Sequence, residues 1–155
     1  MRIRRAQSKE HEVLSRIALE AKAWWGYCAE DLALWEADLS ISSDSVARWP
    51  TYVAELDGDV AGFFQLGLAP GVAELEHFWV LPAHMGKGIG RALLERAVRE
   101  VAARGRAELL IDADPNAERF YVACGAEHTG EKSAPAVGQP QRVRPQLALP
   151  TTNPT

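Results

Sequence analysis

A glycine-rich turn in the middle of the chain joins a predicted strand to a predicted helix. The strand 73–81 ends at Pro82, which has no N–H to donate to a neighbouring strand. The turn Met85-Gly86-Lys87-Gly88-Ile89-Gly90-Arg91 follows, and apolar residues then recur at helical spacing up to Val101. The start of a helix offers unpaired N–H groups and a positive dipole end, which glycine lets a phosphate approach closely. The turn therefore predicts a pyrophosphate-binding site, to which Lys87 and Arg91 add positive charge.

Two common phosphate-binding loops fit this segment poorly. A Walker loop requires Ser or Thr after Gly-Lys, whereas Gly88 follows Lys87 here. A dinucleotide-binding fingerprint requires GxGxxG in the first βαβ unit, whereas GxGxG occurs here mid-chain, after an antiparallel stretch. A nucleotide-binding α/β module is therefore the weakest of the functional hypotheses.

The rest of the pattern predicts the order β-α-α-β-β-β-α-β-α-β-β. Predicted strands cover 2–6, 52–56, 60–64, 73–81, 107–111, 126–131 and 142–149, and Asp57-Gly58 favours a tight turn within the first hairpin. Predicted helices run from a Ser8 cap to Gly26, over 30–39, from Ile89 to a stop at Gly105, and over 115–124. The serine-rich segment 40–45 is predicted to be a loop, and Pro145 to make the last strand an edge strand or a bulged one.

This order predicts one mixed α/β (α+β) sheet with helices on both faces. Residues 1–150 are expected to form a single domain and 151–155 a flexible tail, since 155 residues suit one core. The composition, 47% hydrophobic and 25% charged, is that of an ordinary globular protein.

Several classes of function are disfavoured by composition. A net charge of −4 argues against nucleic-acid binding, and no window approaches the roughly 20 apolar residues of a membrane span. The basic start is followed by polar residues rather than an apolar segment, so a cytoplasmic protein is expected. Cys28 and Cys124 form no CxxC pair and the histidines are scattered, so no metal site is expected.

The glycine turn resembles motif A of the GCN5-related N-acetyltransferase (GNAT) family, Arg/Gln-x-x-Gly-x-Gly/Ala. It departs from this pattern at the first position, where Met85 stands in place of Arg or Gln. The segment 112–126 resembles a second family feature, an Asn-rich turn that leads to Phe/Leu-Tyr and then Gly. Asp114 stands where many members have Asn, and Asn116 is the residue that could take over a cofactor contact. The element order also agrees, which implies a GNAT-like, mostly antiparallel twisted sheet of six to seven strands.

The resemblance implies that acetyl-CoA is the co-substrate. In the family, the strand before the turn separates from its neighbour and binds the pantetheine arm through its backbone, which Phe78, Trp79 and Val80 would do here. The N–H of Val80 would polarise the thioester carbonyl. The residues expected at the cofactor are Trp79, Val80, Met85, Gly86, Lys87, Gly88, Ile89, Gly90, Arg91 and Asn116.

Catalysis would require a base for the acceptor and an acid for the leaving group. An amine with a pKa of about 10 is mostly protonated at neutral pH, and coenzyme A leaves as a thiolate. By resemblance Tyr121 is the acid, although packing of its helix on the sheet is the alternative. Glu76 is the favoured base, with Glu74 next and a water chain also open; Glu74 and Glu76 are expected on one strand face and His77 on the other.

By the resemblance, the acceptor wall is expected near the first two helices, where Trp24, Trp25, Tyr27 and Trp35 cluster and to which His77 is added. Aromatic walls suit apolar or cationic ligands, and ordinary core packing is the alternative. The leading hypothesis is N-acetyl transfer to a primary amine, with a small molecule favoured over a protein because no peptide-reading module is visible. A homodimer is compatible with the family.

The main alternative is a non-catalytic acetyl-CoA-binding sensor or partner subunit. Met85 and Asp114 depart from the family pattern and favour this alternative, whereas Tyr121 matches the pattern and argues against it.

Overall fold

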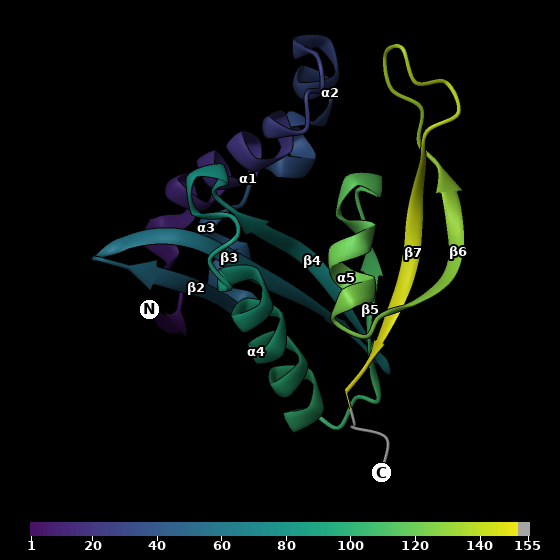
Figure 1. Cartoon of the computed structure of the whole chain (residues 1–155). Coiled ribbons are helices and arrows are strands. Elements are labelled where there is room, and N and C mark those ends of the chain that lie inside the picture. Colours follow the sequence, from purple (N-terminus) through teal and green to yellow (C-terminus); the bar gives the residue numbers. More distant parts are fainter. Residues whose placement is uncertain (152–155) are drawn as a thin grey trace.

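Seven strands form one twisted sheet in the order β1-β2-β3-β4-β5-β7-β6 (Figure 1). The structure is a computed structural model and describes residues 1–151. All neighbouring strands are antiparallel except β4 and β5, which confirms the mixed, mostly antiparallel sheet. The strands are β1 (Arg2–Arg5), β2 (Thr51–Leu56), β3 (Asp59–Ala69), β4 (Val72–Val80), β5 (Glu108–Asp112), β6 (Glu127–Ser133) and β7 (Val143–Pro150).

Helices cover both faces of this sheet. On one face lie α1 (His11–Trp24), α2 (Ala29–Leu39) and α3 (Ser43–Arg48); on the other lie α4 (Ile89–Ala103) and α5 (Glu118–Ala123). Short 3₁₀ turns add η1 (Ser8–Glu10), η2 (Pro82–His84) and η3 (Pro115–Ala117). We call the two sides of the sheet the α1 face and the α4 face.

Each face has its own apolar core, and adjacent residues of β3 enter different cores. Phe63 packs with Leu14 and Ile17 on the α1 face, whereas Phe64 packs with Leu93 on the α4 face. All five side chains are fully buried. This alternation follows from the period of two in a strand, and it explains why β3 is apolar on both sides.

The start of the first helix differs from the sequence prediction. Ser8 does not cap it, because residues 8–10 form the 3₁₀ turn η1 and α1 begins at His11. Glu10 instead accepts a hydrogen bond from the Gln7 N–H (2.8 Å) and pairs with Arg4 of β1 (2.9 Å). The turn is thereby tied to the edge of the sheet.

The predicted loop at 40–45 was wrong in its second half, where α3 begins. Ser42 caps this helix, since its hydroxyl accepts a hydrogen bond from the Ser45 N–H (3.1 Å). Serine is typical both of loops and of helix N-caps, and composition alone did not separate the two.

The predicted hairpin between β2 and β3 is confirmed. Asp57 and Gly58 both have positive φ, 53° and 86°, as the tight turn requires.

Pro145 does not mark an edge strand, because β7 lies between β5 and β6. Its carbonyl accepts a hydrogen bond from the Ala113 N–H (3.0 Å), just beyond the end of β5 at Asp112. The backbone N and O of one strand residue point to the same side of the strand. The N–H that Pro145 lacks would therefore face a position where β5 has already ended. The bulge lies on β6 instead, between His128 and Gly130.

The predicted tail begins with an anchored residue. Thr151 donates a backbone hydrogen bond to Ala107 (3.0 Å) and a side-chain one to Arg106 (2.6 Å), while residues 152–155 lie outside the described residues. Within residues 1–151 the longest helix, α4, has 15 residues, and no helix there meets the length and hydropathy of a membrane span.

Gly62 of β3 lies tightly against the backbone of β4, and we predict that Gly62→Ala destabilises the fold. A Cβ there would lie 2.7 Å from the Trp79 carbonyl oxygen and 3.3 Å from Leu93 Cδ1. Overpacking of this kind costs about 2 kcal/mol of unfolding free energy, measurable by urea denaturation. Gly130→Ala is the control, since no atom lies within 4 Å of its Cβ and its φ is not positive. Equal stability of the two variants would contradict the prediction.

Candidate functional site

The two parallel strands β4 and β5 pair at a single position, Glu74 with Leu110. Beyond that point β4 continues along β3 as far as Val80, and β5 continues along β7. The strands therefore separate, and their facing backbone edges are left open. The Leu81 N–H donates to Ala61 of β3 (2.8 Å), and since successive N–H groups point to opposite edges, the Val80 N–H points towards the gap.

The glycine turn brings the start of α4 to the same end of β4. Gly86 and Gly88 have φ values of +77° and +82°, in the left-handed region that glycine adopts without strain. Gly88 precedes the helix, and its carbonyl accepts the first helical hydrogen bond, from Ala92 (3.1 Å). The N–H groups of Ile89, Gly90 and Arg91 consequently precede the first helical bond and carry the positive end of the helix dipole.

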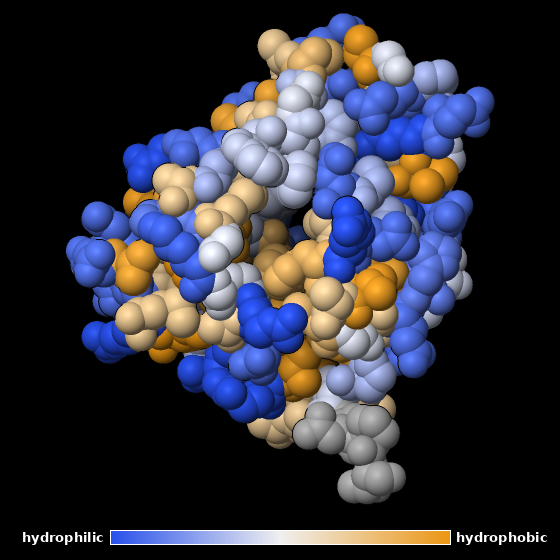
Figure 2. Space-filling model, in the orientation of Figure 1, coloured by the Kyte–Doolittle hydropathy of each residue, from blue (hydrophilic) through white to orange (hydrophobic). Residues whose placement is uncertain are grey.

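A cavity of about 510 Å³, here called the α4-face cleft, lies between the glycine turn, β4 and α5. Figure 2 shows this side of the molecule hollowed near its centre, with apolar residues at the edge of the hollow. Eight residues predicted to bind the cofactor line this cleft: Trp79, Val80, Met85, Gly86, Gly88, Gly90, Arg91 and Asn116. Sequence reasoning therefore identified one continuous surface rather than scattered positions.

Two of the predicted cofactor residues lie elsewhere. The Lys87 side chain is outside the cleft lining, with its Nζ 3.5 Å from His84 Nδ1. The Ile89 side chain is buried in the core of the α4 face, so only its backbone N–H is available at the turn.

Three aromatic rings from both sides of the gap form its apolar wall. Phe78 of β4 stacks on Phe120 of α5 (5.7 Å between ring centres) and meets Tyr121 edge-on (5.8 Å). Gly90 allows this contact, because a Cβ there would lie 3.3 Å from the Phe120 ring. Burial above all, together with the negative charge of Asp114, raises the pKa of the Tyr121 hydroxyl, which therefore stays protonated at neutral pH.

A bulge in β4 determines which way the predicted base residues point. The register changes from Gln65↔His77 to Leu66↔Leu75, so Glu76 is an extra residue without a partner. Its side chain lies over Gly67 of β3, where any Cβ would collide with the carboxylate. Burial, together with the adjacent Glu74 carboxylate, raises the pKa of Glu76.

The prediction that His77 lies on the opposite strand face from Glu74 and Glu76 was wrong. The bulge reverses the alternation, so His77 points to the α1 face, where its ring is 6.1 Å from that of Phe63. Trp79 Nε1 donates to His77 Nδ1 (3.2 Å), and burial lowers the pKa of His77 to about 4. The imidazole is therefore neutral, with its Nδ1 lone pair already engaged.

A second cavity, of about 680 Å³, lies on the other side of the gap and is here called the α1-face cavity. It shares Glu76, His77 and Asp114 with the α4-face cleft, so the two meet where β4 and β5 separate. The two cavities therefore adjoin at the gap in the sheet.

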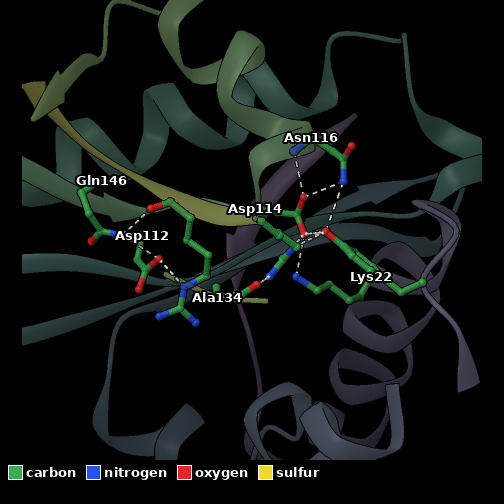
Figure 3. A network of polar contacts seen from close by, with 9 residues as sticks. Lys22, Asp112, Asp114, Asn116, Ala134 and Gln146 are labelled. Atoms are coloured by element: carbon green, nitrogen blue, oxygen red, sulfur yellow. Dashed lines mark hydrogen bonds and ion pairs between the residues drawn. The ribbon is translucent and has the colours of Figure 1, made fainter. Parts of the chain in front are cut away.

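A buried polar network holds the walls of this junction together (Figure 3). One oxygen of Asp114, Oδ2, accepts hydrogen bonds from Lys22 (2.6 Å), Tyr27 (2.8 Å) and Arg142 (3.2 Å). The other, Oδ1, accepts from the backbone and side-chain amides of Asn116 (2.8 and 2.9 Å). Burial alone would raise the pKa of Asp114, but these donors, Lys22 above all, hold it below its usual value.

The predicted aromatic wall is divided between several roles. Trp25 lines the α4-face cleft, whereas Trp24 is 55% exposed and lines neither cavity. Tyr27 is buried within the Asp114 network and lines neither cavity. Trp35, the fourth aromatic residue of the predicted wall, lines the α1-face cavity.

Five charged residues of the α1-face cavity were missed by sequence reasoning: Lys22, Asp38, Lys132, Arg142 and Arg144. Each lies outside the glycine turn and β4, on helices or on the last hairpin. Charged residues there resemble ordinary surface residues, and no spacing in the sequence singles them out. Among residues 1–151 no cluster of three His, Cys, Asp or Glu side chains forms a candidate metal site.

The model of the acetyltransferase (GNAT) family matches residues 12–126. This segment includes α1, the separating strands, the glycine turn and α5, and it exceeds half of the chain. The protein belongs to this family. The GNAT motif A thus corresponds to the turn at the mouth of the α4-face cleft.

Two relatives and one solved structure illustrate the similarity. A mycothiol acetyltransferase of Kineococcus radiotolerans is 40% identical over 75 residues, 47% of this chain but 25% of the relative. An uncharacterized N-acetyltransferase of Archaeoglobus fulgidus is 36% identical over 80 residues, 45% of this chain and 54% of the relative. The PaiA N-acetyltransferase of Thermoplasma acidophilum, solved in complex with coenzyme A, has a TM-score of 0.79 at 20% identity, over 96% of this chain and 98% of that one. The chain therefore spans a quarter of the first curated relative and about half of the second. Its likeness to PaiA is one of fold.

Proposed function

We propose that this GNAT protein transfers the acetyl group of acetyl-CoA to a primary amine of a small molecule. The observation that carries the proposal is the meeting of two cavities at the gap between β4 and β5. One is bordered by free backbone N–H groups and an apolar wall, and the other by carboxylates. The proposed catalytic unit is residues 1–150.

The α4-face cleft suits coenzyme A in both charge and shape. The amides at the start of α4 would hold the diphosphate, with Arg91 adding positive charge at the cleft lining. The open edge of β4 would receive the polar groups of the pantetheine arm through its unpaired backbone. Met85, off-pattern in motif A, lines the cleft without charge, so binding would depend on the backbone more than on that side chain.

Acetyl transfer would then occur at the junction of the two cavities. A neutral amine in the α1-face cavity would attack the acetyl carbonyl, so that a C–N bond forms and the C–S bond breaks. The Val80 N–H, directed into the gap, would stabilise the negative charge that develops on the carbonyl oxygen. Tyr121, held protonated, would donate a hydrogen bond to the departing thiolate.

Glu76 is the proposed base because it borders both cavities and has a raised pKa. Burial makes its carboxylate a stronger base than an exposed one, and it would take the ammonium proton before attack. Glu74 lines only the α1-face cavity and would make Glu76 more basic rather than replace it. His77 is a weaker candidate, since its Nδ1 already accepts a hydrogen bond from Trp79.

We predict that Gly88→Glu abolishes acetyl-CoA binding, because it places a negative side chain at the proposed diphosphate site. The measurement is isothermal titration with acetyl-CoA. Gly58→Glu is a matched control, since Gly58 has a similar φ (+86° against +82°) and equally open surroundings but lies in the β2–β3 hairpin. Unchanged affinity in Gly88→Glu, or equal loss in both variants, would refute the site.

We predict that Tyr121→Phe lowers kcat by roughly 10²-fold while leaving the affinity for acetyl-CoA nearly unchanged. The reason is that the change removes the donor to the leaving sulfur but keeps the ring against Phe78. Steady-state thiol release gives kcat, and Tyr52→Phe, which removes a hydroxyl from β2, is the control. Full activity of Tyr121→Phe would reduce that residue to packing.

We predict that Glu76→Gln lowers kcat/KM by roughly 10²-fold and removes one ionisation from its pH profile. In the parent protein kcat/KM should fall as the pH drops through the raised pKa of Glu76, because the protonated form cannot accept a proton. The ionisation of the amine itself should remain in the variant. If the pH profile of Glu76→Gln keeps both ionisations while that of Glu74→Gln loses one, the base is Glu74 and not Glu76.

The same assays separate an enzyme from a non-catalytic acetyl-CoA sensor. A sensor would bind acetyl-CoA and lose that binding in Gly88→Glu, but it would release no thiol with any amine. Thiol release that depends on an added amine would exclude the sensor.

A further inference from the structure

The α1-face cavity carries opposite charges on two of its walls. The first, here called the acidic wall, is formed by Glu74 and Glu76 of β4 and Asp38 of α2. The second, here called the basic wall, lies on the last hairpin and α1 and contains Lys22, Lys132, Arg142 and Arg144 together with Asp112 and Asp114. A ligand with a single charge would satisfy only one of these walls.

Positive charge exceeds negative charge on the basic wall. Asp114 is shared by two cations, Lys22 (2.6 Å) and Arg142 (3.2 Å). Asp112 is likewise shared by Arg144 (3.1 Å) and Lys132 (3.9 Å). Each carboxylate thus faces two cations, so one positive charge in each pair of cations remains unbalanced.

Arg144 and Lys132 are the cations of this wall that are most available to a ligand. The Arg144 side chain is 42% exposed and lines the cavity, whereas Arg142 is almost fully buried. Although Arg144 Nε is 3.1 Å from Asp112 Oδ1, it is buried without a hydrogen-bond acceptor among the described residues. The guanidinium is therefore attracted to Asp112 without being held by it, and Lys132 beside it is 60% exposed.

The acidic wall lies where the attacking amine must be. Glu76 borders both cavities at the junction, and Asp38 is close enough to influence the ionisation of His77 there. None of the ion pairs among residues 1–151 includes Glu74, Glu76 or Asp38. This wall can therefore accept an ammonium group without first displacing an internal partner.

The sheet sets the distance between the two walls. Glu74 on β4 pairs with Leu110 on β5, and Asp112 on β5 pairs with Gln146 on β7, two residues from Arg144. Leu110 in turn pairs with Ala148, so Arg144 lies two strand spacings across and four residues along β7 from Glu74, roughly 15 Å between backbones. Both side chains line the cavity between these positions, which leaves room for a small molecule charged at both ends.

We propose that the acceptor is a small amine that also carries a carboxylate, with its amine at Glu74 and Glu76 and its carboxylate on Arg144 and Lys132. The inference rests on the proposed acetyl transfer and specifies its substrate class. The carboxylate takes no part in the bond changes; it positions the amine at the thioester and provides discrimination against simple amines.

Matched pairs of amines that differ only by a carboxylate test this assignment. Suitable pairs are β-alanine and ethylamine, 6-aminohexanoate and pentylamine, lysine and 1,5-diaminopentane, and phenylalanine and 2-phenylethylamine. For the pairs that are acetylated, kcat/KM should favour the acid by roughly tenfold to hundredfold, the worth of a charge-assisted hydrogen bond. Equal rates, or faster acetylation of the simple amines, would overturn the inference while leaving acetyl transfer intact.

Variants of the basic wall provide the second arm. Arg144→Gln and Lys132→Gln should raise KM for the acid and reduce its advantage over the simple amine about tenfold. Arg99→Gln on the exposed surface of α4 removes the same charge far from the cavity and should change neither. An advantage that survives Arg144→Gln combined with Lys132→Gln would overturn the assignment. If no pair is acetylated although acetyl-CoA binds, the proposed acceptor and this inference both fail.

Discussion

Strands β4 and β5 run parallel yet pair at only one position, and the rest of the site depends on their separation. Parallel neighbours require a crossover, and here the crossover is α4, so the start of a helix comes to the end of β4 where the gap opens. The gap remains open because β3 and β7 satisfy the outer edges of the two strands, while Phe78 and Phe120 line its α4 side. One topological feature thus supplies both the helix amides and the unpaired strand backbone.

Charge near the gap is controlled by burial and by close pairing. Asp114 binds two cations from distant segments, Lys22 and Arg142. Both cations also contact the Trp35 ring, whose centre lies 4.9 Å from the Lys22 ammonium and 5.2 Å from the Arg142 guanidinium. Ions this deeply buried cost solvation free energy that well-packed apolar side chains would not. Their position between α1, the turn before α5 and the last hairpin suggests why they are kept: they fix three segments around one junction. An asparagine at 114 could keep the hydrogen bonds to Asn116 but would not balance the two cations.

Sequence reasoning was most successful where a local pattern has one physical cause. The glycine turn, the Asp57-Gly58 hairpin and the element order follow from backbone geometry and periodicity, and the structure has all three. It failed where a single residue changes the outcome. The bulge at Glu76 reverses the face of His77, and nothing in the local sequence announces it. It also missed the Asp114 network, because residues 22, 114 and 142 come together only through the tertiary fold, and no pattern along the chain relates them.

The central claim is that main-chain amides at the start of α4 hold the diphosphate of coenzyme A beside the gap between β4 and β5. A crystal structure of the protein with acetyl-CoA measures this directly. We expect diphosphate oxygens within hydrogen-bonding distance of the N–H groups between Gly86 and Arg91, and the thioester at the junction near Val80 and Tyr121. A coenzyme bound away from the glycine turn, or a thioester that does not reach this junction, would contradict the account.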